Sequence, residues 1–473
     1  MLTYNIKEWV ELIEPIVAAL SDLVWGPPYP LLILLIGTHV FLSFQLGFIQ
    51  FKSLPLAFKI IFSKSEHEGD ISQFSALMTA LASTVGTGNI VGVATAIALG
   101  GPGAIFWMWI TGLLGMATKY SEGLLAVKYR QKGKTGMQGG PMYYLANGLG
   151  KRWLGCFFAI FTVFAAFGAG NMVQANATSN IFICSFSIPK ETTGIALAFL
   201  TGIVLIGGIK SIGRFASFCV PFMIVIYLAT MFVVLGINFD KIPGALSLIF
   251  SSAFSGTAAA GGFVGATLAA AIRFGVSRGL FSNESGLGSA AIAAASAKTN
   301  DPVKQALVSM TGTFIDTLVV CTMTALVILT SDAWLMMGIN EAAEITSKSV
   351  EASLGQAGAI IIAFATGLFA FSTLIGWGFY GEKALEFLFG TKAITLYRII
   401  YTFLVFIGAT IPLVLVWDFS DVMFGMMAIP NLIGLIFLIK IIKSIQRKKK
   451  TVYKRKDIKK IVVQILCLDI KNL

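Results

Sequence analysis

Residues 85 to 89 read Val85-Gly86-Thr87-Gly88-Asn89 and lie in the middle of an apolar segment that runs from about residue 71 to residue 99. Glycine is unfavourable inside a helix, because each one costs roughly 1 kcal/mol relative to alanine. In lipid, every backbone N–H and C=O that leaves the helical pattern also needs a partner inside the protein or a water-filled cavity. This stretch therefore predicts a broken membrane helix beside a cavity, the arrangement with which transporters hold ions and small zwitterions.

The composition indicates a protein that crosses the bilayer many times. Of the 473 residues, 56% are hydrophobic and 12% are charged, and the mean hydropathy is +0.83; such values are typical of polytopic membrane proteins. The net charge of +12 does not indicate nucleic-acid binding, because much of the excess lies between Lys440 and Lys460, directly after the last apolar run. A basic segment in that place is typical of a cytoplasmic anchor beside anionic lipid.

Cysteine and histidine are too few and too scattered to form a metal centre or a catalytic set. The five cysteines include no CxxC pair, and the two histidines, His39 and His67, lie in unrelated contexts. We therefore expect no enzyme activity and no cofactor, and nothing in the sequence implies an obligate protein partner.

Eleven apolar runs are long enough to span a bilayer. They lie at about 29–50, 71–97, 102–127, 153–183, 192–208, 212–236, 258–296, 303–330, 355–389, 394–416 and 418–440. Between them we expect a short external helix from Lys241 to Ser255 and an external excursion from Ser331 to Leu354. Residues 1–25 combine apolar residues at helical spacing with acids, which predicts an amphipathic helix in the membrane interface, with a solvated leader as the alternative.

Lysine and arginine predict the orientation. If the N-terminus lies outside, the cation-rich loops around Lys59, Lys132 and Arg214 and the basic tail all fall inside. The opposite side then carries an acidic set: Asp332, Glu341, Glu344 and Glu351. The positive-inside rule thus predicts a multi-pass protein with its N-terminus outside and its C-terminus in the cytoplasm. We expect it in the plasma membrane.

The spans divide into one extra leading helix and two groups of five. The corresponding ranges are 26–60 for the leading helix, 71–236 and 258–440 for the two groups, and 441–473 for the basic tail. Because five is odd, the second group must insert upside down relative to the first. Each group opens with a glycine-interrupted span, at Gly86 in the first and at Phe274-Gly275 in the second. Paired broken helices in inverted halves indicate a transporter site.

The first broken span offers groups for both an ion and a carboxylate. Unwinding around Gly86 exposes the carbonyls of Ala82 and Val85 to a cation, and the N–H groups of Gly88 and Asn89 to an anion at the positive end of the next half-helix. The alternative is a glycine seam that only lets two helices touch.

Other spans carry polar residues whose roles stay open. Ser372 and Thr373 could complete a Na⁺ site or bond back to the preceding helical turn, and Thr366 and Trp377 share the face of Thr373. Phe167, Asn171 and Gln174 lie on one face and contact either a ligand or another helix. Arg278 and Glu284 form either a gate on the cytoplasmic side or an anchor for their helix. Lys119 and Glu122 are expected to form a structural pair. Asp316 is expected either to bind an ion or to tether a helix.

Three stretches carry a family resemblance: Gly100-Gly101-Pro102-Gly103-Ala104-Ile105-Phe106-Trp107-Met108-Trp109-Ile110, residues 83–90 and residues 278–289. They resemble hallmark segments of the alanine or glycine:cation symporters, and the similarity runs from about Trp25 to Lys440. The resemblance implies an all-α membrane protein of eleven transmembrane helices, with a LeuT-like five-plus-five inverted repeat and one extra N-terminal helix. It also implies Na⁺-coupled uptake of alanine or glycine.

The resemblance further implies roles for individual residues. Ala82 and Val85, with Ser372 and Thr373, match a Na⁺ site, and Thr87, Gly88 and Asn89 match the stretch that binds the substrate carboxylate. The rest of the substrate pocket is expected at Phe167, Asn171, Gln174, Phe274, Gly275, Thr366 and Trp377. The second broken helix departs from the LeuT pattern, because it carries Ala269-Ala270-Ala271 where a hydroxyl would serve a further ion, which puts a second Na⁺ in doubt.

We therefore expect a sodium-coupled secondary active symporter that imports small neutral amino acids, alanine and glycine, by alternating access. A proton-coupled amino-acid transporter is the alternative. An ion channel is less favoured, because inverted broken helices are typical of alternating access. The aromatic residues Phe167, Phe274 and Trp377 are expected to exclude large side chains. The expected partners are Na⁺, the amino acid and the lipid bilayer.

Overall fold

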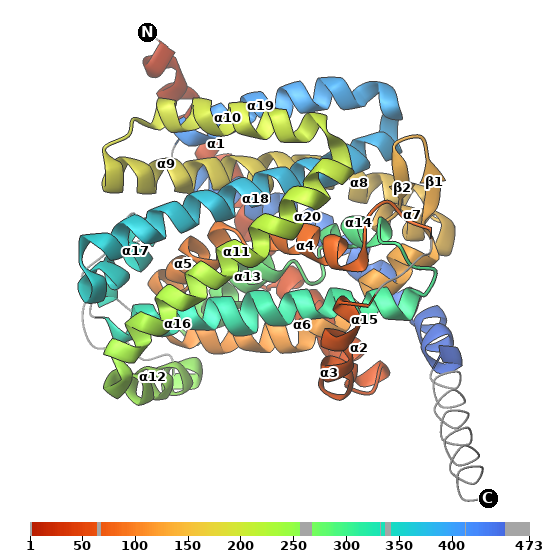
Figure 1. Ribbon diagram of the computed structural model, residues 1–473, viewed down its shortest axis with the longest axis horizontal. Coiled ribbons are helices and arrows are strands. Elements are labelled where there is room, and N and C mark those ends of the chain that lie inside the picture. The colour runs from red at the N-terminus through yellow and green to blue at the C-terminus, as the bar shows by residue number, and fades with distance from the viewer. Residues whose placement is uncertain are drawn as a thin grey trace, which may run out of the picture.

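The computed structural model describes residues 2–63, 68–255, 267–331, 333–335, 342–411 and 413–449. These residues form helices and one small hairpin, β1 (Gln131–Gly133) paired antiparallel with β2 (Gly136–Gln138). Figure 1 shows the helices packed side by side in one body. Some predicted features fall outside the described residues, namely His67, Asp332, Glu341 and the tail beyond residue 449. The predicted runs at 258–296 and 394–416 and the excursion at 331–354 are described only in part.

Most helices of the first half lie within the predicted apolar runs, and α3 does not. They are α1 (Leu2–Trp25), α2 (Pro30–Gln45), α3 (Ile49–Ile61), α4 (Gln73–Thr84), η1 (Thr87–Asn89), α5 (Val91–Gly100), α6 (Gly103–Lys128), α7 (Pro141–Tyr143), η2 (Tyr144–Gly148), α8 (Arg152–Phe167), η3 (Gly168–Met172), α9 (Val173–Phe186), α10 (Lys190–Ile206), α11 (Gly208–Ile237), η4 (Phe239–Lys241) and α12 (Ile242–Ser255). The expected short helix before residue 256 is thus present as α12.

The second half repeats the pattern of a broken helix followed by long ones. Its elements are α13 (Leu268–Asn283), α14 (Ser289–Ala295), α15 (Pro302–Thr313), η5 (Phe314–Cys321), α16 (Thr322–Thr330), η6 (Ala333–Leu335), α17 (Ala342–Leu354), α18 (Gln356–Phe389), η8 (Thr391–Ala393), α19 (Ile394–Thr410) and α20 (Leu413–Phe437). Within the described ranges, seven helical segments are long and apolar enough to cross a bilayer, α11 and α18 among them. The chain is therefore a multi-pass membrane protein.

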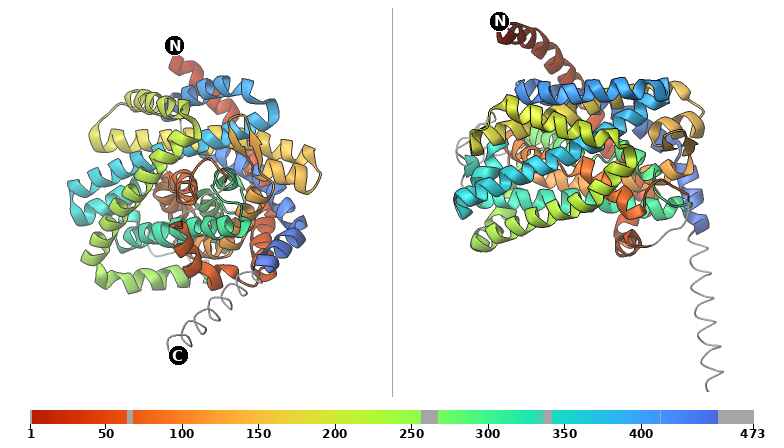
Figure 2. Two further views of the ribbon diagram at one scale, coloured as in Figure 1. Left: turned by 45° about the vertical axis from the view of Figure 1, so that its right-hand side comes forward. Right: turned by 45° about the horizontal axis from the view of Figure 1, so that its top comes forward.

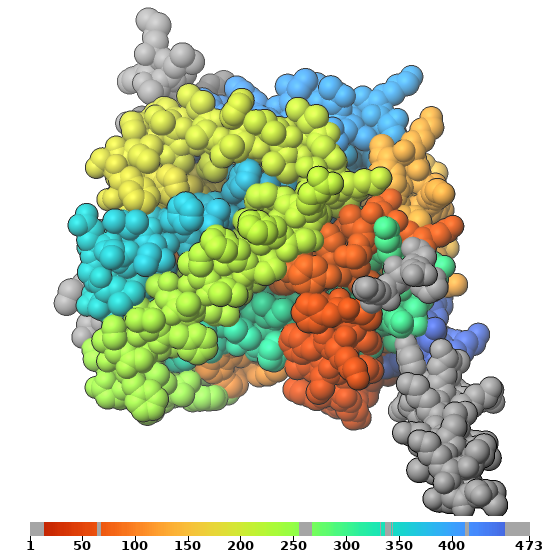
Figure 3. Space-filling model, viewed as in Figure 1, coloured from red at the N-terminus to blue at the C-terminus, as the bar shows by residue number. Residues whose placement is uncertain are grey.

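The two broken helices lie at the centre of the molecule. In the left view of Figure 2 their coils are surrounded by the other helices. α6 packs along α13 and α15, whereas α8 packs on α18 and α20. On the face seen in Figure 3, α11 crosses diagonally between the α9–α10 layer and the segment that holds α3 and α4. α11 also turns large apolar side chains such as Phe218 and Phe232 outward, as a lipid-facing helix does.

The predicted break in the first span is confirmed. α4 ends at Thr84, Gly86 is extended at φ −136°, a short 3₁₀ turn follows, and α5 begins at Val91. Every residue from Leu81 to Val91 is buried. Irregular backbone at this depth needs internal partners, and side chains from other helices supply them.

The second break does not lie at Phe274-Gly275, and that prediction was wrong. α13 runs without interruption through Gly275, where a Cβ would collide with the backbone of Ala104, so this glycine allows α13 and α6 to touch. The helix instead breaks between Glu284 and Gly288, where Glu284, Gly286 and Gly288 all have positive φ. Positive φ is the conformation for which glycine is favoured.

The N-terminal segment contains a turn that the sequence did not predict. α2 ends at Gln45, and Gly47 and Phe48 at positive φ lead into α3. The last turn of α1 packs on α20, where the Val24 side chain lies against Gly425. The placement of α1 in the membrane interface stays a prediction.

Candidate functional site

The end of α4 meets two hydroxyl groups of α18. Ser372 Oγ and Thr373 Oγ1 each lie 3.1 Å from the Ala82 carbonyl oxygen, and each also donates to the Phe369 carbonyl, at 2.9 and 3.0 Å. These residues are buried, as is Val85, which caps α4. Hydroxyl and carbonyl oxygens are ligands of hard cations, and the C-terminal end of a helix carries partial negative charge. The arrangement thus suits a small cation.

The residue after the break is held by Gln174 of α9. Thr87 donates both its backbone N–H, at 3.1 Å, and its hydroxyl, at 2.9 Å, to Gln174 Oε1. The Gln174 amide nitrogen donates in turn to the Ala169 carbonyl at 2.9 Å. One acceptor oxygen therefore occupies the place where two donors of the break converge, which is the geometry that a carboxylate oxygen would use.

Asn89 connects the first break to the second broken helix and to η5. Its side-chain oxygen accepts from the Gly86 N–H at 2.9 Å, and its amide nitrogen donates to Asp316 Oδ1 at 2.7 Å. Asp316 Oδ2 accepts from the hydroxyls of Ser282, at 2.6 Å, and Thr317, at 2.9 Å. Asp316 therefore tethers the two breaks, one of its two predicted roles. Ser282 was missed in the sequence, although it directly precedes the glycine-rich break.

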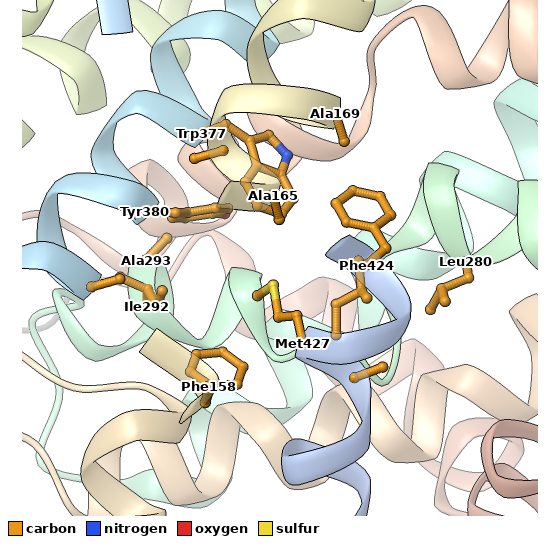
Figure 4. Close-up of a cluster of buried hydrophobic side chains, with 14 of the residues drawn as sticks. Phe158, Ala165, Ala169, Leu280, Ile292, Ala293, Trp377, Tyr380, Phe424 and Met427 are labelled. Atoms are coloured by element: carbon orange, nitrogen blue, oxygen red, sulfur yellow. The ribbon is translucent and has the colours of Figure 1, made fainter. Parts of the chain in front are cut away.

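An aromatic wall stands beside the first break. Trp377 stacks on Phe424 with ring centroids 5.3 Å apart, Phe281 lies 5.3 Å from Phe424, and Trp417 lies 4.5 Å from Phe281. Figure 4 shows the Trp377 and Phe424 side chains in one buried cluster, with Ala165 and Ala169 nearby. A Cβ on Gly88 would lie 2.9 Å from the Phe281 ring, so this wall reaches the break.

Several predicted pocket residues lie elsewhere in this conformation. Phe274 and Gly275 pack against the region where α5 and α6 meet, and Thr366 bonds back to the Ile362 carbonyl at 2.8 Å. Phe167 and Asn171 face α19: Phe167 stacks on Tyr397 at 5.5 Å, and Asn171 donates to the Tyr401 carbonyl at 2.7 Å. The structure therefore brings to the first break Gln174 with Ala82, Val85, Thr87, Gly88, Asn89, Ser372 and Thr373. Trp377 belongs to the aromatic wall, which reaches the break through Phe281.

Arg278 does not pair with Glu284, so the predicted gate between these two residues was wrong. Arg278 forms a buried ion pair with Asp421 of α20 at 2.6 Å, and its guanidinium lies 4.4 Å from the centre of the Trp417 ring. The indole of Trp25 also donates to the Asp421 carbonyl at 3.0 Å. Glu284 lies in the second break, and its carboxylate accepts a hydrogen bond from the Ser289 hydroxyl. The Arg278–Asp421 pair lies at the Trp417 end of the aromatic wall.

Lys119 and Glu122 of α6 do not form the expected pair either. Within the described part of the chain, Lys119 Nζ is buried without a hydrogen-bond partner. Glu122 Oε1 accepts from the Gly286 N–H at 3.0 Å and from the Asn431 amide at 2.8 Å. The acid thus satisfies the backbone of the second break, where helical hydrogen bonds are lost.

The comparisons with known proteins agree on one family. The sequence profile described as the Sodium:alanine symporter family matches residues 10–463. The chain belongs to this family. It is 51% identical over 440 residues to the sodium/alanine symporter AgcS of Methanococcus maripaludis, covering 91% of this chain and 95% of that protein. It is 39% identical over 447 residues to the probable sodium/glutamine symporter GlnT of Bacillus subtilis, covering 93% and 92%.

A solved structure supports the fold. The crystal structure of MhsT in complex with L-phenylalanine superposes with a TM-score of 0.60 at 13% identity, covering 78% of this chain and 89% of that one. The sodium:alanine symporter homologue described here thus has a LeuT-like fold. It is a cation-coupled amino-acid symporter and not an enzyme, as its family membership shows.

Proposed function

We propose that this symporter uses the Na⁺ gradient to import alanine and glycine across the plasma membrane by alternating access. Its N-terminus lies outside and its C-terminus in the cytoplasm. Eleven membrane spans form two inverted groups of five, 71–236 and 258–440, after a leading helix at 26–60. Residues 1–25 lie in the interface, and the basic tail 441–473 contacts anionic lipid.

The observation that carries this proposal is the contact of Ser372 and Thr373 with the Ala82 carbonyl. A Na⁺ ion binds there with the carbonyls of Ala82 and Val85, once the two hydroxyls turn their lone pairs toward it. None of these ligand groups can take up a proton at physiological pH, which favours Na⁺ over H⁺ as the coupling ion. Because the ligands come from both α4 and α18, the ion holds the broken helix against α18.

The substrate binds on the other side of the break. Its carboxylate takes the place of Gln174 Oε1 at the N–H and hydroxyl of Thr87, and Gln174 moves aside or shares these donors. The Gly88 N–H lies at the same end of the break, whereas the Asn89 N–H donates to the Gly86 carbonyl at 3.2 Å. Trp377, Phe424 and Phe281 then limit the space for the side chain, so small neutral amino acids fit best. Phe167, Asn171, Phe274, Gly275 and Thr366 contribute in another state of the cycle.

The membrane potential adds a driving force. Moving one elementary charge across 100 mV supplies about 2.3 kcal/mol. At about 1.4 kcal/mol per tenfold, this corresponds to roughly 40-fold accumulation. The Na⁺ concentration gradient increases that value.

The test is alanine uptake by proteoliposomes with Na⁺, K⁺ or choline outside, with and without an imposed inside-negative potential. We expect uptake above equilibrium only with Na⁺, and more of it with the potential. Thr373→Ala should raise the half-saturating Na⁺ concentration at least tenfold. Thr162→Ala is the matched control, because Thr162 is a buried threonine of α8 whose hydroxyl donates back to the Phe158 carbonyl at 2.8 Å. Uptake indifferent to Na⁺ but driven by a pH gradient would replace Na⁺ with H⁺.

A further inference from the structure

Arg130, two residues beyond α6, holds the ends of both broken helices. Its guanidinium donates to four backbone carbonyls: Ala295 at 3.0 Å, Ala297 at 2.6 Å, Thr299 at 2.7 Å and Glu68 at 2.9 Å. The first is the last residue of α14, the next two follow α14, and Glu68 precedes α4. Charge-assisted hydrogen bonds are about twice as strong as neutral ones, so one side chain joins two chain segments far apart in sequence.

The same two segments also pair through their backbones. Ile71 and Ala297 form a parallel β-bridge, in which Ile71 N donates to the Ser296 carbonyl at 3.2 Å and Lys298 N donates to the Ile71 carbonyl at 2.7 Å. Asp70 N donates to the Ser296 carbonyl as well, at 2.9 Å. The start of α4 and the end of α14 therefore move as one unit.

The β1–β2 hairpin connects this unit to α18. On one side, Met137 N donates to Asp70 Oδ2 at 2.7 Å. On the other side, the Thr135 hydroxyl donates to the Glu386 carboxylate at 2.7 Å, and Glu386 pairs with Lys383 at 2.8 Å. α18 is the helix that carries Ser372 and Thr373. The two helices that supply the candidate ion site are thus joined a second time, at their far ends.

We propose that these contacts form the inner gate of the transporter, which we call the hairpin latch: Arg130, Asp70, the hairpin residues Thr135 and Met137, Lys383 and Glu386. The latch is closed in this structure and opens when α4 and α14 move away from α18 to release ion and substrate. This inference rests on the proposed function and adds the residues that control release. Arg130 and Glu386 act by position and touch neither ligand.

The chemistry of the latch suits a reversible gate. The side chains of Lys383 and Glu386 are only 4% and 2% exposed, so closing the latch removes two charges from water, which offsets much of their attraction. Opening, in which the Thr135 hydroxyl leaves Glu386, returns their hydration. Two states of similar energy are what a switching element requires.

Ser296 supplies a reporter of this gate. It follows α14 directly, its side chain is fully buried, and its hydroxyl has no hydrogen-bond partner among the described residues, so Ser296→Cys changes few interactions. We would place this cysteine in a background with the five native cysteines replaced. A membrane-impermeant maleimide is then added to either face of sealed vesicles, with Na⁺ or choline present.

With Na⁺ present, we expect the reporter cysteine to react slowly with the maleimide. After Arg130→Ala the reaction should be at least tenfold faster, and only when the maleimide is added to the cytoplasmic face. Arg130→Lys keeps the positive charge but not the several donors of the guanidinium. Its labelling rate should lie between those of the parent and Arg130→Ala. Lys132→Ala is the matched control, because Lys132 is an exposed cation of the same hairpin, and it should label like the parent. Melting temperature in detergent verifies that each variant is folded.

Labelling that is equally slow in folded Arg130→Ala, or that comes from the extracellular face, would overturn the latch. The outcomes for latch and transport can be told apart. If the parent lacks Na⁺-driven uptake while Arg130 still controls labelling, the proposed function fails and the gate remains. If uptake is Na⁺-driven and the labelling rate is the same in the parent and in Arg130→Ala, the proposed gate is wrong and the proposed function stands.

Discussion

A single added carbon atom at Gly86 tests the central feature of the site. A Cβ at this position would come closer than 3.0 Å to Thr373 Oγ1, and it would lie 3.1 Å from Gln174 Oε1. Thr373 is a short, β-branched side chain on a packed helix, so it cannot swing away freely. Gly86→Ala should therefore push α18 away from the break at the point where the proposed Na⁺ ligands converge.

The expected size of the effect follows from the cost of overpacking. Inserting a methyl group into a well-packed site costs about 1 to 3 kcal/mol. Because Na⁺ binding needs the two helices in contact, most of this cost falls on the ion-bound state. At about 1.4 kcal/mol per tenfold, the half-saturating Na⁺ concentration should rise roughly 5- to 150-fold.

The assay is alanine uptake in proteoliposomes over a series of Na⁺ concentrations. Gly92→Ala is the matched control in the same span, because the nearest atom to its Cβ is Trp417 Cη2 at 3.9 Å, an ordinary contact. This control should transport like the parent, since alanine is favoured over glycine in a helix. A Gly86→Ala protein whose Na⁺ dependence stays within twofold of the parent would refute the assignment of the ion to this contact.

Substitutions at three further residues test other parts of the site. Gln174→Glu places a negative charge beside the proposed position of the substrate carboxylate. About 4 kcal/mol of repulsion at an effective dielectric of 20 should raise the half-saturating alanine concentration about a thousandfold. Gln174→Ala should raise that concentration tenfold or less. Trp377→Ala removes the ring stacked on Phe424 and should let leucine compete for uptake; continued exclusion of leucine would remove Trp377 from the pocket. Asp421→Asn leaves the buried Arg278 without its ion partner and should destabilise the fold by about 3 to 5 kcal/mol. The measurement is the melting temperature in detergent, which should fall. An unchanged melting temperature would contradict the role of this ion pair.

The positions of the helices were largely predictable from the sequence, because long apolar runs and the polar segments between them mark membrane spans directly. The first break was predictable for the same reason, since two glycines and an asparagine disrupt an otherwise apolar run. The second break was assigned to the wrong glycine. A glycine that allows helices to touch, such as Gly275, looks like one that ends a helix until its backbone angle and neighbours are known.

The composition of the site was harder to predict. Ser372 and Thr373 were paired with Ala82 through family resemblance, and the contact with α4 is visible only in three dimensions. The partner of Arg278 could not be found from the sequence, because Asp421 lies on a helix 143 residues away. Phe424 was missed for the same reason, since periodicity gives the spacing of residues on a helix but not the direction in which that helix faces.

The π-helical turn η3, between α8 and α9, sets the position of Gln174. Such a turn holds one residue more than an α-helical turn, and each residue of an α-helix advances the direction of the side chains by about 100°. Deleting one residue between Gly168 and Met172 would restore regular helix but rotate α9, carrying Gln174 away from Thr87. The single inserted residue therefore determines which face of α9 points toward the first break. Relatives that differ in length at this turn should also differ in which side chain contacts the substrate.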